Sequence, residues 1–444
     1  MNIHFPKFTS SDNELNVTYN YRCELYQRHV KETPDGCVVT EFLPNVGWAG
    51  KHNTINCPAM HHIRDGRWLH ETNVMTDYIK FWCTAGSPRS YSFPLSDSTS
   101  ELEKVTGDNR ISAEMYSDLV KIYYAWDDHK KPNGMFTQLC DRDGMEYSIS
   151  GDGFRTTLNS YMYADGLALA KFAKRNGNNE DAENFENEAH TLCDKINSEL
   201  WNDDIGMYVT RSEKNGIQNV RELVGYIPWI YGIPTEGRDA CFSNLLDENC
   251  FLAKYGLRTA DASHPEYNKH FNHECLWNGP VWPFATAQTL TAVIEYINST
   301  EHPVIDADGF MKLLLQYAYS HRDTDGTPWL DENMDPDTGI WLAREIMRKA
   351  NRSDSERGQH YNHSSFIDLV MTGICGIRPS DDNILVVRPL GTSLDSFKAE
   401  DIRYHGHSVD VCWNKDEGLT VTLDGDKTYF CKAGDNVKLE IVLE

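Results

Sequence analysis

The spacing of apolar residues changes once along the chain, and this change limits the folds that the chain can adopt. Up to residue 375, apolar side chains recur at helical spacing, as in the stripe within residues 113–126. Beyond residue 379, short runs alternate between apolar and polar residues, and turn signals such as Asp424-Gly425 separate them. The pattern predicts a helical domain and then a small antiparallel β-domain, with strands at 384–387, 408–413, 419–423 and 437–443.

Residues 46–376 are long enough for about twelve helices, at ~25 residues for each helix and its loop. The fold class that we predict is mainly α: an (α/α)6 barrel over 46–376 with a β-sandwich-like domain at 377–444. Further apolar stripes predict helices near 159–174, near 185–200 and after Pro283. Periodicity predicts helices but not the closure of a barrel, and residues 1–45 carry no clear pattern.

The chain is acidic, with 42 Lys and Arg against 67 Asp and Glu and a formal net charge of −25. This charge repels polyanions, so we expect neither nucleic acid nor an anionic membrane surface as a partner. The sequence also shows no apolar run of about 18 residues and no export signal after Met1. Twelve cysteines without a Cys-x-x-Cys pair predict reduced thiols and a cytoplasmic location, with a periplasmic one left open.

Three carboxylates surround a glycine within residues 140–151, namely Asp141, Asp143 and Glu146. Crowded carboxylates raise one another's pKa, as a general acid working near neutral pH requires. The same residues are typical of a polar turn with an acidic cap for the following helix. Spacing alone favours the turn.

A second acidic segment places Asp331 and Glu332 directly after Trp329. A carboxylate beside an aromatic ring is partly desolvated, which suits a general base. The alternatives are a solvated acidic loop or a cation site, although the spacing of an EF-hand is missing. The ligands of such a cation site would be Asp335, Asp337 and the Thr338 carbonyl.

Two further segments carry flat apolar faces and hydrogen-bonding groups that suit a sugar ring. Residues 276–283 bracket Asn-Gly-Pro with two tryptophans, and residues 57–69 combine arginines, an aspartate and a tryptophan. A buried structural loop is the alternative in each case. The predicted substrate-binding residues are Trp48, Arg64, Asp65, Arg67, Trp68, Trp277, Asn278, Trp282 and Trp329.

The histidines do not predict a metal site. His61 and His62 are neighbours that would diverge on a helix, and no ligand set accompanies His360 and His363. We therefore expect histidines that are satisfied within loops. The sequence also has no Gly-x-Ser-x-Gly elbow, no Walker loop and no complete Gly-x-Gly-x-x-Gly motif.

Taken in order, these segments resemble the six-hairpin glycosidases related to trehalase, glycoside hydrolase family 63 and mannosylglycerate hydrolase. The resemblance covers roughly residues 46–376. Residues 144–148, Gly-Met-Glu-Tyr-Ser, are similar to the stretch with the general acid of that family, and residues 331–339 to the stretch with its general base. The resemblance implies a carbohydrate substrate, inversion at the anomeric carbon, and neither a metal nor an organic cofactor. Glu146 would be the acid and Glu332 the base, and the tryptophan loop would line the pocket.

The sequence departs from the family pattern near the expected substrate. Glu146 stands where the family has Asp, so Asp143 is the alternative acid. The arginine of the family's tryptophan loop is Asn278 here. The residues that could replace its guanidinium are Arg155, Arg64 and Arg67. Many relatives carry an N-terminal β-domain that this sequence lacks, which leaves a truncated chain, a homo-oligomer or a partner subunit open.

Two other functions compete with hydrolysis. Sugar isomerases and epimerases also use helical barrels with acid–base pairs, usually including histidine, and His61, His62 and His360 keep this alternative open. A non-catalytic carbohydrate-binding protein is the second alternative, if the change from Asp to Glu abolished catalysis.

Overall fold

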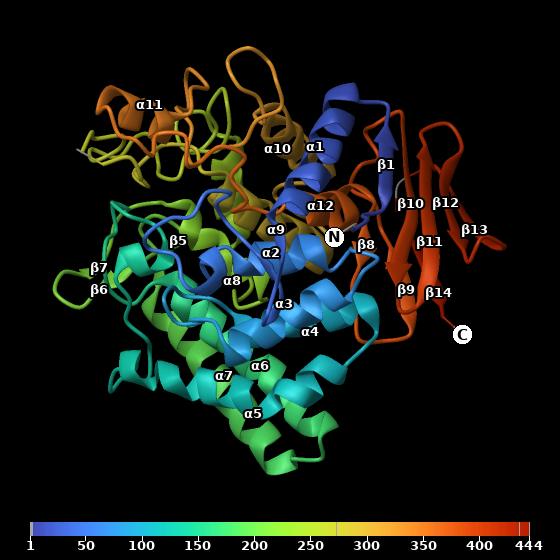
Figure 1. Ribbon diagram of the computed structural model, residues 1–444, viewed down its shortest axis with the longest axis horizontal. Helices are drawn as coiled ribbons and strands as arrows, with labels where there is room; N and C mark the ends of the chain where they lie inside the picture. Colours follow the sequence, from blue (N-terminus) through green and yellow to red (C-terminus); the bar gives the residue numbers. More distant parts are fainter. Residues whose placement is uncertain (1–2, 272, 435, 444) are drawn as a thin grey trace.

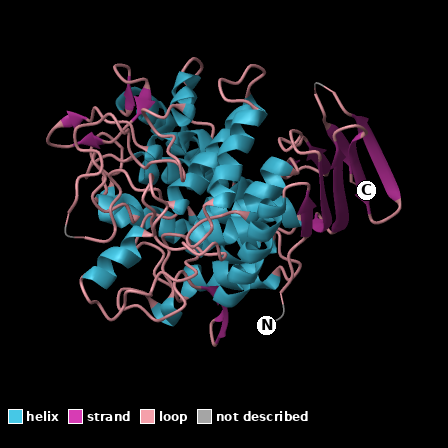
Figure 2. Cartoon of the chain, turned by 90° about the horizontal axis from the view of Figure 1, so that it is seen from above, coloured by secondary structure: helices cyan, strands magenta, loops and turns pink. Residues whose placement is uncertain are grey.

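The computed structural model describes residues 3–271, 273–434 and 436–443. It consists of a mainly helical body with a small antiparallel β part at one side (Figures 1 and 2). The helices are α1 (Asn13–His29), α2 (Ala59–Gly66), α3 (Asn73–Thr84), α4 (Leu95–Thr106), α5 (Arg110–Ala125), α6 (Thr156–Arg175), α7 (Asn179–Glu199), α8 (Ile227–Ile230), α9 (Pro283–Ser299), α10 (Ala307–Tyr319), α11 (Leu342–Lys349) and α12 (Ile367–Leu369). Among the helices of these residues, none combines the length and the apolar character needed to cross a lipid bilayer.

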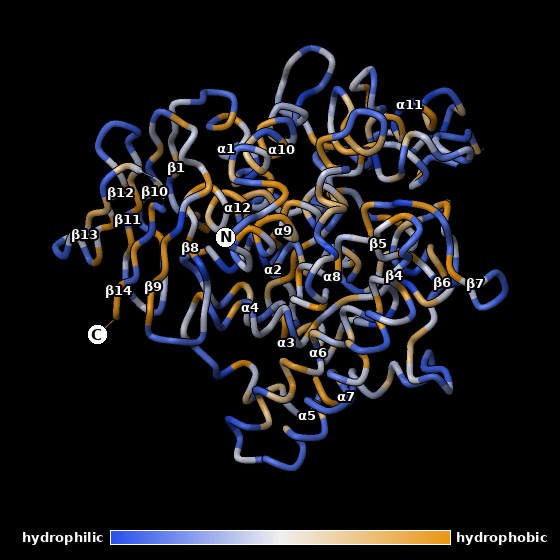
Figure 3. The backbone as a smooth tube through the Cα atoms, turned by 180° about the vertical axis from the view of Figure 1, so that it is seen from behind, coloured by the Kyte–Doolittle hydropathy of each residue, from blue (hydrophilic) through white to orange (hydrophobic). Residues whose placement is uncertain are grey.

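The helices predicted from apolar stripes are confirmed in α5, α6, α7 and α9. α5 and α7 bury one face each, whereas α6 and α9 are buried on nearly all sides. α9 begins at Pro283, whose fixed φ suits the first turn of a helix, and Figure 3 shows hydrophobic segments of the chain around its label. Gly166 of α6 faces α7, where an added Cβ would lie 3.2 Å from the Ala189 Cβ. The contact between α6 and α7 therefore depends on a small residue at position 166.

The C-terminal part forms two antiparallel sheets, with strand orders β1-β10-β11-β12-β13 and β14-β9-β8. Their strands are β1 (Lys7–Ser10), β8 (Ile377–Arg378), β9 (Ile384–Val387), β10 (Ser396–Tyr404), β11 (His407–Asn414), β12 (Gly418–Leu423), β13 (Lys427–Lys432) and β14 (Leu439–Val442). The four predicted strands are confirmed as β9, β11, β12 and β14. β10 escapes a pattern search because its register shifts between Ala399 and Ile402, and β13 escapes it because this edge strand is largely exposed.

The helical body also carries short hairpins, formed by β2 (Val30–Thr33) with β3 (Gly36–Val39), β4 (Trp201–Asn202) with β5 (Met207–Tyr208), and β6 (Arg211–Ser212) with β7 (Gly216–Ile217).

The N-terminal segment, to which the sequence assigned no structure, belongs to both parts of the molecule. β1 pairs antiparallel with β10, so the first strand of the chain extends the C-terminal sheet (Figure 1). α1 follows, with Asp12 as its N-cap, which accepts a hydrogen bond from the Leu15 backbone N–H at 2.9 Å. The Thr18 hydroxyl then donates to the Ala318 carbonyl of α10 at 2.8 Å. The N-terminal segment therefore packs against both the C-terminal sheet and the helical body.

A buried aspartate joins three distant segments of the helical body. The Asp65 carboxylate at the end of α2 accepts hydrogen bonds from the backbone N–H groups of Phe366 (3.1 Å) and Asp368 (2.8 Å). Arg22 of α1 lies 3.5 Å from the same carboxylate, and both side chains are almost fully buried. Removing one partner of such a group leaves the other charged and desolvated.

We expect Asp65→Ala to lower the free energy of unfolding by about 3–5 kcal/mol, because the Arg22 charge would stay buried without its partner. The matched control is Asp395→Ala, which breaks a solvent-exposed pair with Lys415 and should change the free energy of unfolding far less. Urea unfolding of the two variants measures the difference. Equal losses would contradict the role assigned to Asp65.

Candidate functional site

A cavity of about 260 Å³ opens among the loops of the helical body, and four glutamates line it: Glu41, Glu146, Glu274 and Glu332. We call it the glutamate cavity. It brings together the two carboxylates that the sequence singled out, although 186 positions separate them in the chain. Three predicted substrate-binding residues, Trp48, Trp277 and Trp282, also line the glutamate cavity.

Glu146 lies in a turn that begins with a left-handed residue, Gly144 (φ +70°). An added Cβ at Gly144 would lie 2.7 Å from the Cys57 sulfur, so the turn requires glycine there. The Trp277 backbone N–H donates to the Glu146 carbonyl at 3.0 Å, which fixes the turn to the tryptophan loop. Burial raises the pKa of the Glu146 carboxyl to about 7, and the negative charge of Glu332 adds to the shift. Glu146 can therefore carry a proton near neutral pH.

Glu332 is held by two side chains at the wall of the glutamate cavity. The Arg357 Nε donates to Glu332 Oε1 at 2.9 Å, and the Cys275 thiol donates to Oε2 at 3.3 Å. The neighbouring Asp331 faces another way, because it accepts from the Trp329 indole N–H at 3.2 Å. An arginine partner suits a carboxylate that acts as a proton acceptor.

Glu41 is a third buried carboxyl in the glutamate cavity that the sequence did not reveal. The Tyr361 hydroxyl donates to Glu41 Oε1. Burial raises the pKa of the Glu41 carboxyl to about 8, and the charges of Glu332 and Glu146 raise it further while Tyr361 and Arg357 lower it. No sequence signal marks Glu41, because it stands alone in the stretch Thr-Glu-Phe-Leu.

The guanidinium groups beside these glutamates come from Arg352 and Arg357, which the sequence also did not reveal. Arg352 Nη1 donates to Glu274 Oε1 at 2.6 Å, and Arg357 Nη2 donates to the same oxygen at 3.0 Å. The aromatic face of Trp48 lies over Arg357, with 4.8 Å between the ring centroid and the guanidinium carbon. Both arginines follow Glu332 by about 20–25 residues in a loop rich in charges. This position is a weak indication of a role in the site by itself.

The two tryptophans of the predicted sugar platform stack on each other rather than standing apart. The rings of Trp277 and Trp282 lie 4.4 Å apart at 15°. Both side chains are buried at the wall of the glutamate cavity. Asn278 points away and donates to the Lys269 carbonyl at 2.9 Å. Trp329 packs against His360 and Arg344 outside the glutamate cavity.

One histidine departs from the expectation that the histidines are satisfied. His363 lines the glutamate cavity and is 1% exposed, and neither of its ring nitrogens has a hydrogen-bond partner among the described residues. Its ring packs on Tyr361 at 4.0 Å. His360 and His62 follow the expectation, because their rings bond to the Tyr21 hydroxyl and to the Asn362 carbonyl. His61 departs from the expectation in part, because Ser365 bonds to one of its nitrogens and no described residue bonds to the other.

Asp143, the alternative acid, lies buried behind the Glu146 turn and does not line the glutamate cavity. Its carboxylate contacts Arg155 Nε and the hydroxyls of Ser92 and Thr157. Arg155, one of the expected substrate contacts, also donates to the Gly151 carbonyl at 2.6 Å. The structure therefore uses Asp143 and Arg155 to hold the turn that carries Glu146.

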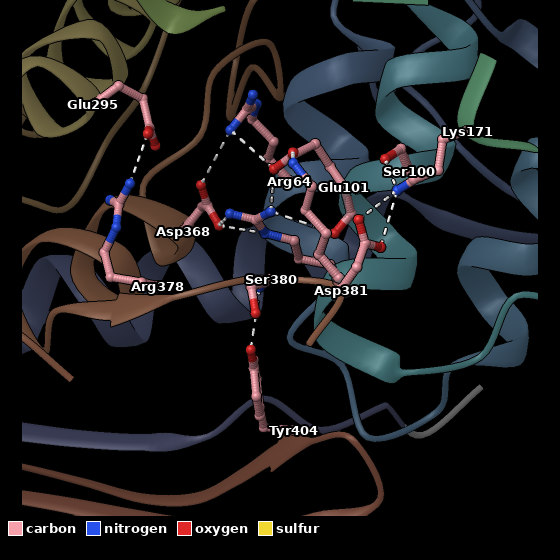
Figure 4. A network of polar contacts seen from close by, with 12 residues as sticks. Arg64, Ser100, Glu101, Lys171, Glu295, Asp368, Arg378, Ser380, Asp381 and Tyr404 are labelled. Atoms are coloured by element: carbon pink, nitrogen blue, oxygen red, sulfur yellow. Dashed lines mark hydrogen bonds and ion pairs between the residues drawn. The ribbon is translucent and has the colours of Figure 1, made fainter. Parts of the chain in front are cut away.

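Arg64 lies in a charged network with Glu101 and Asp368, away from the glutamate cavity (Figure 4). Asp368 accepts hydrogen bonds from Arg67 Nε at 2.8 Å and from the Trp68 indole N–H at 2.7 Å. Arg64 lies 3.8 Å from Glu101, beside a second cavity of about 950 Å³. The structure therefore does not bring Arg64, Arg67, Trp68 or the buried Asp65 to the glutamate cavity.

The acidic loop after Glu332 caps its own turn. One Asp335 oxygen accepts hydrogen bonds from the Asp337 and Thr338 backbone N–H groups and from the Thr338 hydroxyl. Within residues 3–271, 273–434 and 436–443, no group of three or more His, Cys, Asp or Glu side chains is placed to hold a metal ion.

Comparison with known proteins gives a family and related folds. Residues 51–364 match the model of the mannosylglycerate hydrolase MGH1-like glycoside hydrolase domain. A solved structure described as a sialidase is 31% identical with a TM-score of 0.92, and the match covers 98% of this chain and 41% of that one. The chain thus spans less than half the length of that relative.

Two more distant structures share the fold. The mannosylglycerate hydrolase of family 63 from Thermus thermophilus, solved in complex with glucose, is 14% identical with a TM-score of 0.56. That match covers 74% of this chain and 98% of that one. The family 78 rhamnosidase from Bacillus sp. GL1 is 13% identical with a TM-score of 0.62, covering 94% of this chain and 41% of that one.

We expect Glu332→Gln to lower the pKa of Glu146 below about 7, because the Glu332 charge opposes ionisation of Glu146. Carbon-13 NMR of labelled glutamate carboxyls measures the pKa, with the Glu146 signal assigned by its loss in Glu146→Gln. Glu248→Gln, at an exposed position, is the control and should leave the titration unchanged. An unchanged pKa in Glu332→Gln would show that the two carboxyls are not coupled.

Proposed function

The chain belongs to the family of mannosylglycerate hydrolase MGH1-like glycoside hydrolase domains, and on this premise we propose that it cleaves a glycosidic bond with inversion, using Glu146 as general acid and Glu332 as general base. The observation that carries the proposal is the pairing of these two glutamates in one cavity with different surroundings. Glu146 is desolvated and contacts no arginine among the described residues, whereas Glu332 is bound to Arg357. Opposite surroundings for two carboxyls are what an acid–base pair requires.

The proposed reaction is a single displacement by water. Glu146 donates its proton to the glycosidic oxygen as the bond from that oxygen to the anomeric carbon breaks. Glu332 takes a proton from a water molecule, whose oxygen bonds to the anomeric carbon on the opposite face. Glu146 ends as a carboxylate and Glu332 as a carboxylic acid, and exchange with solvent restores both. The separation of their carboxyl groups should be about 6.5–9.5 Å, the range that leaves room for the water.

We propose that the helices close into an (α/α)6 barrel around this site. The all-round burial of α6 and α9 suits inner helices, and the one-sided burial of α5 and α7 suits outer ones. The cavity volume of about 260 Å³ lies below the ~300–1,000 Å³ of sites for drug-sized ligands. It supports an exo-acting enzyme that encloses one terminal sugar.

The relatives leave the substrate open, because the sialidase, the mannosylglycerate hydrolase and the rhamnosidase are named for different sugars. Isomerisation gains no support, because His61, His62 and His360 lie outside the lining of the glutamate cavity. A cytoplasmic location is supported by twelve cysteines that are all free. A homo-oligomer or a partner subunit stays a proposal without a contact surface to support it.

We expect Glu332→Gln to lower kcat by about 100- to 10,000-fold, the contribution typical of a general base. The protein should stay folded, because the amide has nearly the shape of the carboxylate. The first product seen by NMR with the wild-type enzyme should have the anomeric configuration opposite to the substrate. Full activity in a folded Glu332→Gln variant, or a product of retained configuration, would overturn the proposal.

We expect substrates with a good leaving group to restore activity to a variant that lacks the general acid, because such a leaving group departs with less protonation. Glu146→Gln should therefore cleave aryl glycosides with acidic phenols far better than alkyl glycosides. In the wild type, kcat/KM on alkyl glycosides should fall as pH rises through about 7, because Glu146 then loses its proton. Asp143→Asn is the matched comparison, and rescue of this variant instead of Glu146→Gln would make Asp143 the acid.

A further inference from the structure

Every arginine that lines the glutamate cavity is already paired with a carboxylate of the protein. Arg357 binds Glu332 at 2.9 Å and Glu274 at 3.0 Å. Arg352 binds Glu274 at 2.6 Å and Asp354 at 2.7 Å. No other Lys or Arg is found among the described residues of the lining. The two arginines are therefore occupied before any ligand enters.

His363, a histidine of the lining, does not add a positive charge. Burial lowers the pKa of His363 well below its usual value, so its ring is neutral. An anionic sugar would thus bring its carboxylate next to glutamates and to arginines that already bind carboxylates, which is costly in a desolvated site.

Glu41 offers a hydrogen-bond donor for a sugar hydroxyl. Its Oε1 accepts from the Tyr361 hydroxyl, and no hydrogen bond to its Oε2 is described. Desolvation and the neighbouring charges of Glu332 and Glu146 favour its protonated form. A neutral carboxyl in this position accepts at one oxygen and donates from the other. The adjacent His363 and the Trp277 indole N–H also lack partners among the described residues, as is expected of groups that a ligand completes.

We infer that Glu41 is a specificity-determining residue that donates a hydrogen bond to a hydroxyl of an uncharged sugar ring, and that the glutamate cavity excludes sugars carrying a carboxylate. This inference rests on the proposed function for the identity of the ligand as a sugar. It concerns recognition of the ring and involves neither proposed proton transfer.

Matched monosaccharide pairs test the substrate class in the wild-type protein. Calorimetric titration compares D-glucose with D-glucuronate, D-galactose with D-galacturonate, and D-mannose with D-mannuronate, together with L-rhamnose and N-acetylneuraminate. At least one neutral sugar should bind. Its acidic counterpart, where the panel contains one, should bind at least about tenfold more weakly, which corresponds to about 1.4 kcal/mol of binding free energy. Equal or tighter binding of an acidic sugar, or no binding of any neutral sugar, would overturn the inference.

Two substitutions of Glu41 test its role. Glu41→Ala removes the hydrogen-bond donor and should weaken the binding of the neutral sugar by about tenfold or more. Glu41→Gln keeps an acceptor for Tyr361 and a donor for the sugar, so its affinity should stay within about threefold of the wild type. Glu301→Gln, at an exposed position, is the control. Wild-type affinity in Glu41→Ala, or equal losses in the Ala and Gln variants, would contradict the assignment.

The binding assay separates this inference from the proposed function. If neutral sugars bind through Glu41 but no glycoside is hydrolysed, the hydrolytic proposal fails and the recognition site stands. If a glycoside of an acidic sugar is hydrolysed with inversion, the hydrolytic proposal stands and the inference fails.

Discussion

Four glutamates share one cavity with two arginines, and this imbalance sets the protonation of the site. Glu332 and Glu274 take the arginine partners. Glu146 and Glu41 are left desolvated beside negative charge, and their pKa values rise to about 7 and about 8. A water-filled site would shield these charges from one another, so the acid–base character depends on how well the loops exclude water.

The loops around this cavity are held by buried ionic groups that do not touch it. Asp143 and Arg155 fix the turn of Glu146, and Asp65 joins Arg22 to the backbone at residues 366–368. Such groups are costly to desolvate, and removal of one partner leaves the other charge buried, so each group ties its segments to one arrangement. The chain between its helices consists largely of long loops, which makes this anchoring necessary.

Much of the fold and the two central carboxylates could be predicted from the sequence, because helical stripes and local motifs are short-range patterns. The sequence predicts that the arginines of residues 57–69 bind the substrate, whereas the structure places them outside the lining of the glutamate cavity. A charged stretch has the same sequence pattern whether its partner is a ligand or a distant aspartate such as Asp368. Glu41 and Arg357 could not be found, since each is an isolated charge whose role arises from contacts with residues far along the chain. β1 was missed for the same reason, because its partner strand lies at the other end of the sequence.

The pairing of β1 with β10 has a consequence for how the protein is made. Residues 7–10 leave the ribosome about 390 residues before their partners at residues 397–400, which at ~5–20 residues per second is tens of seconds. During that interval the edge of the nascent strand is unpaired and open to wrong partners. Synthesis speed and chaperone protection of residues 7–10 thus become determinants of yield, although these residues lie outside the cavity lining.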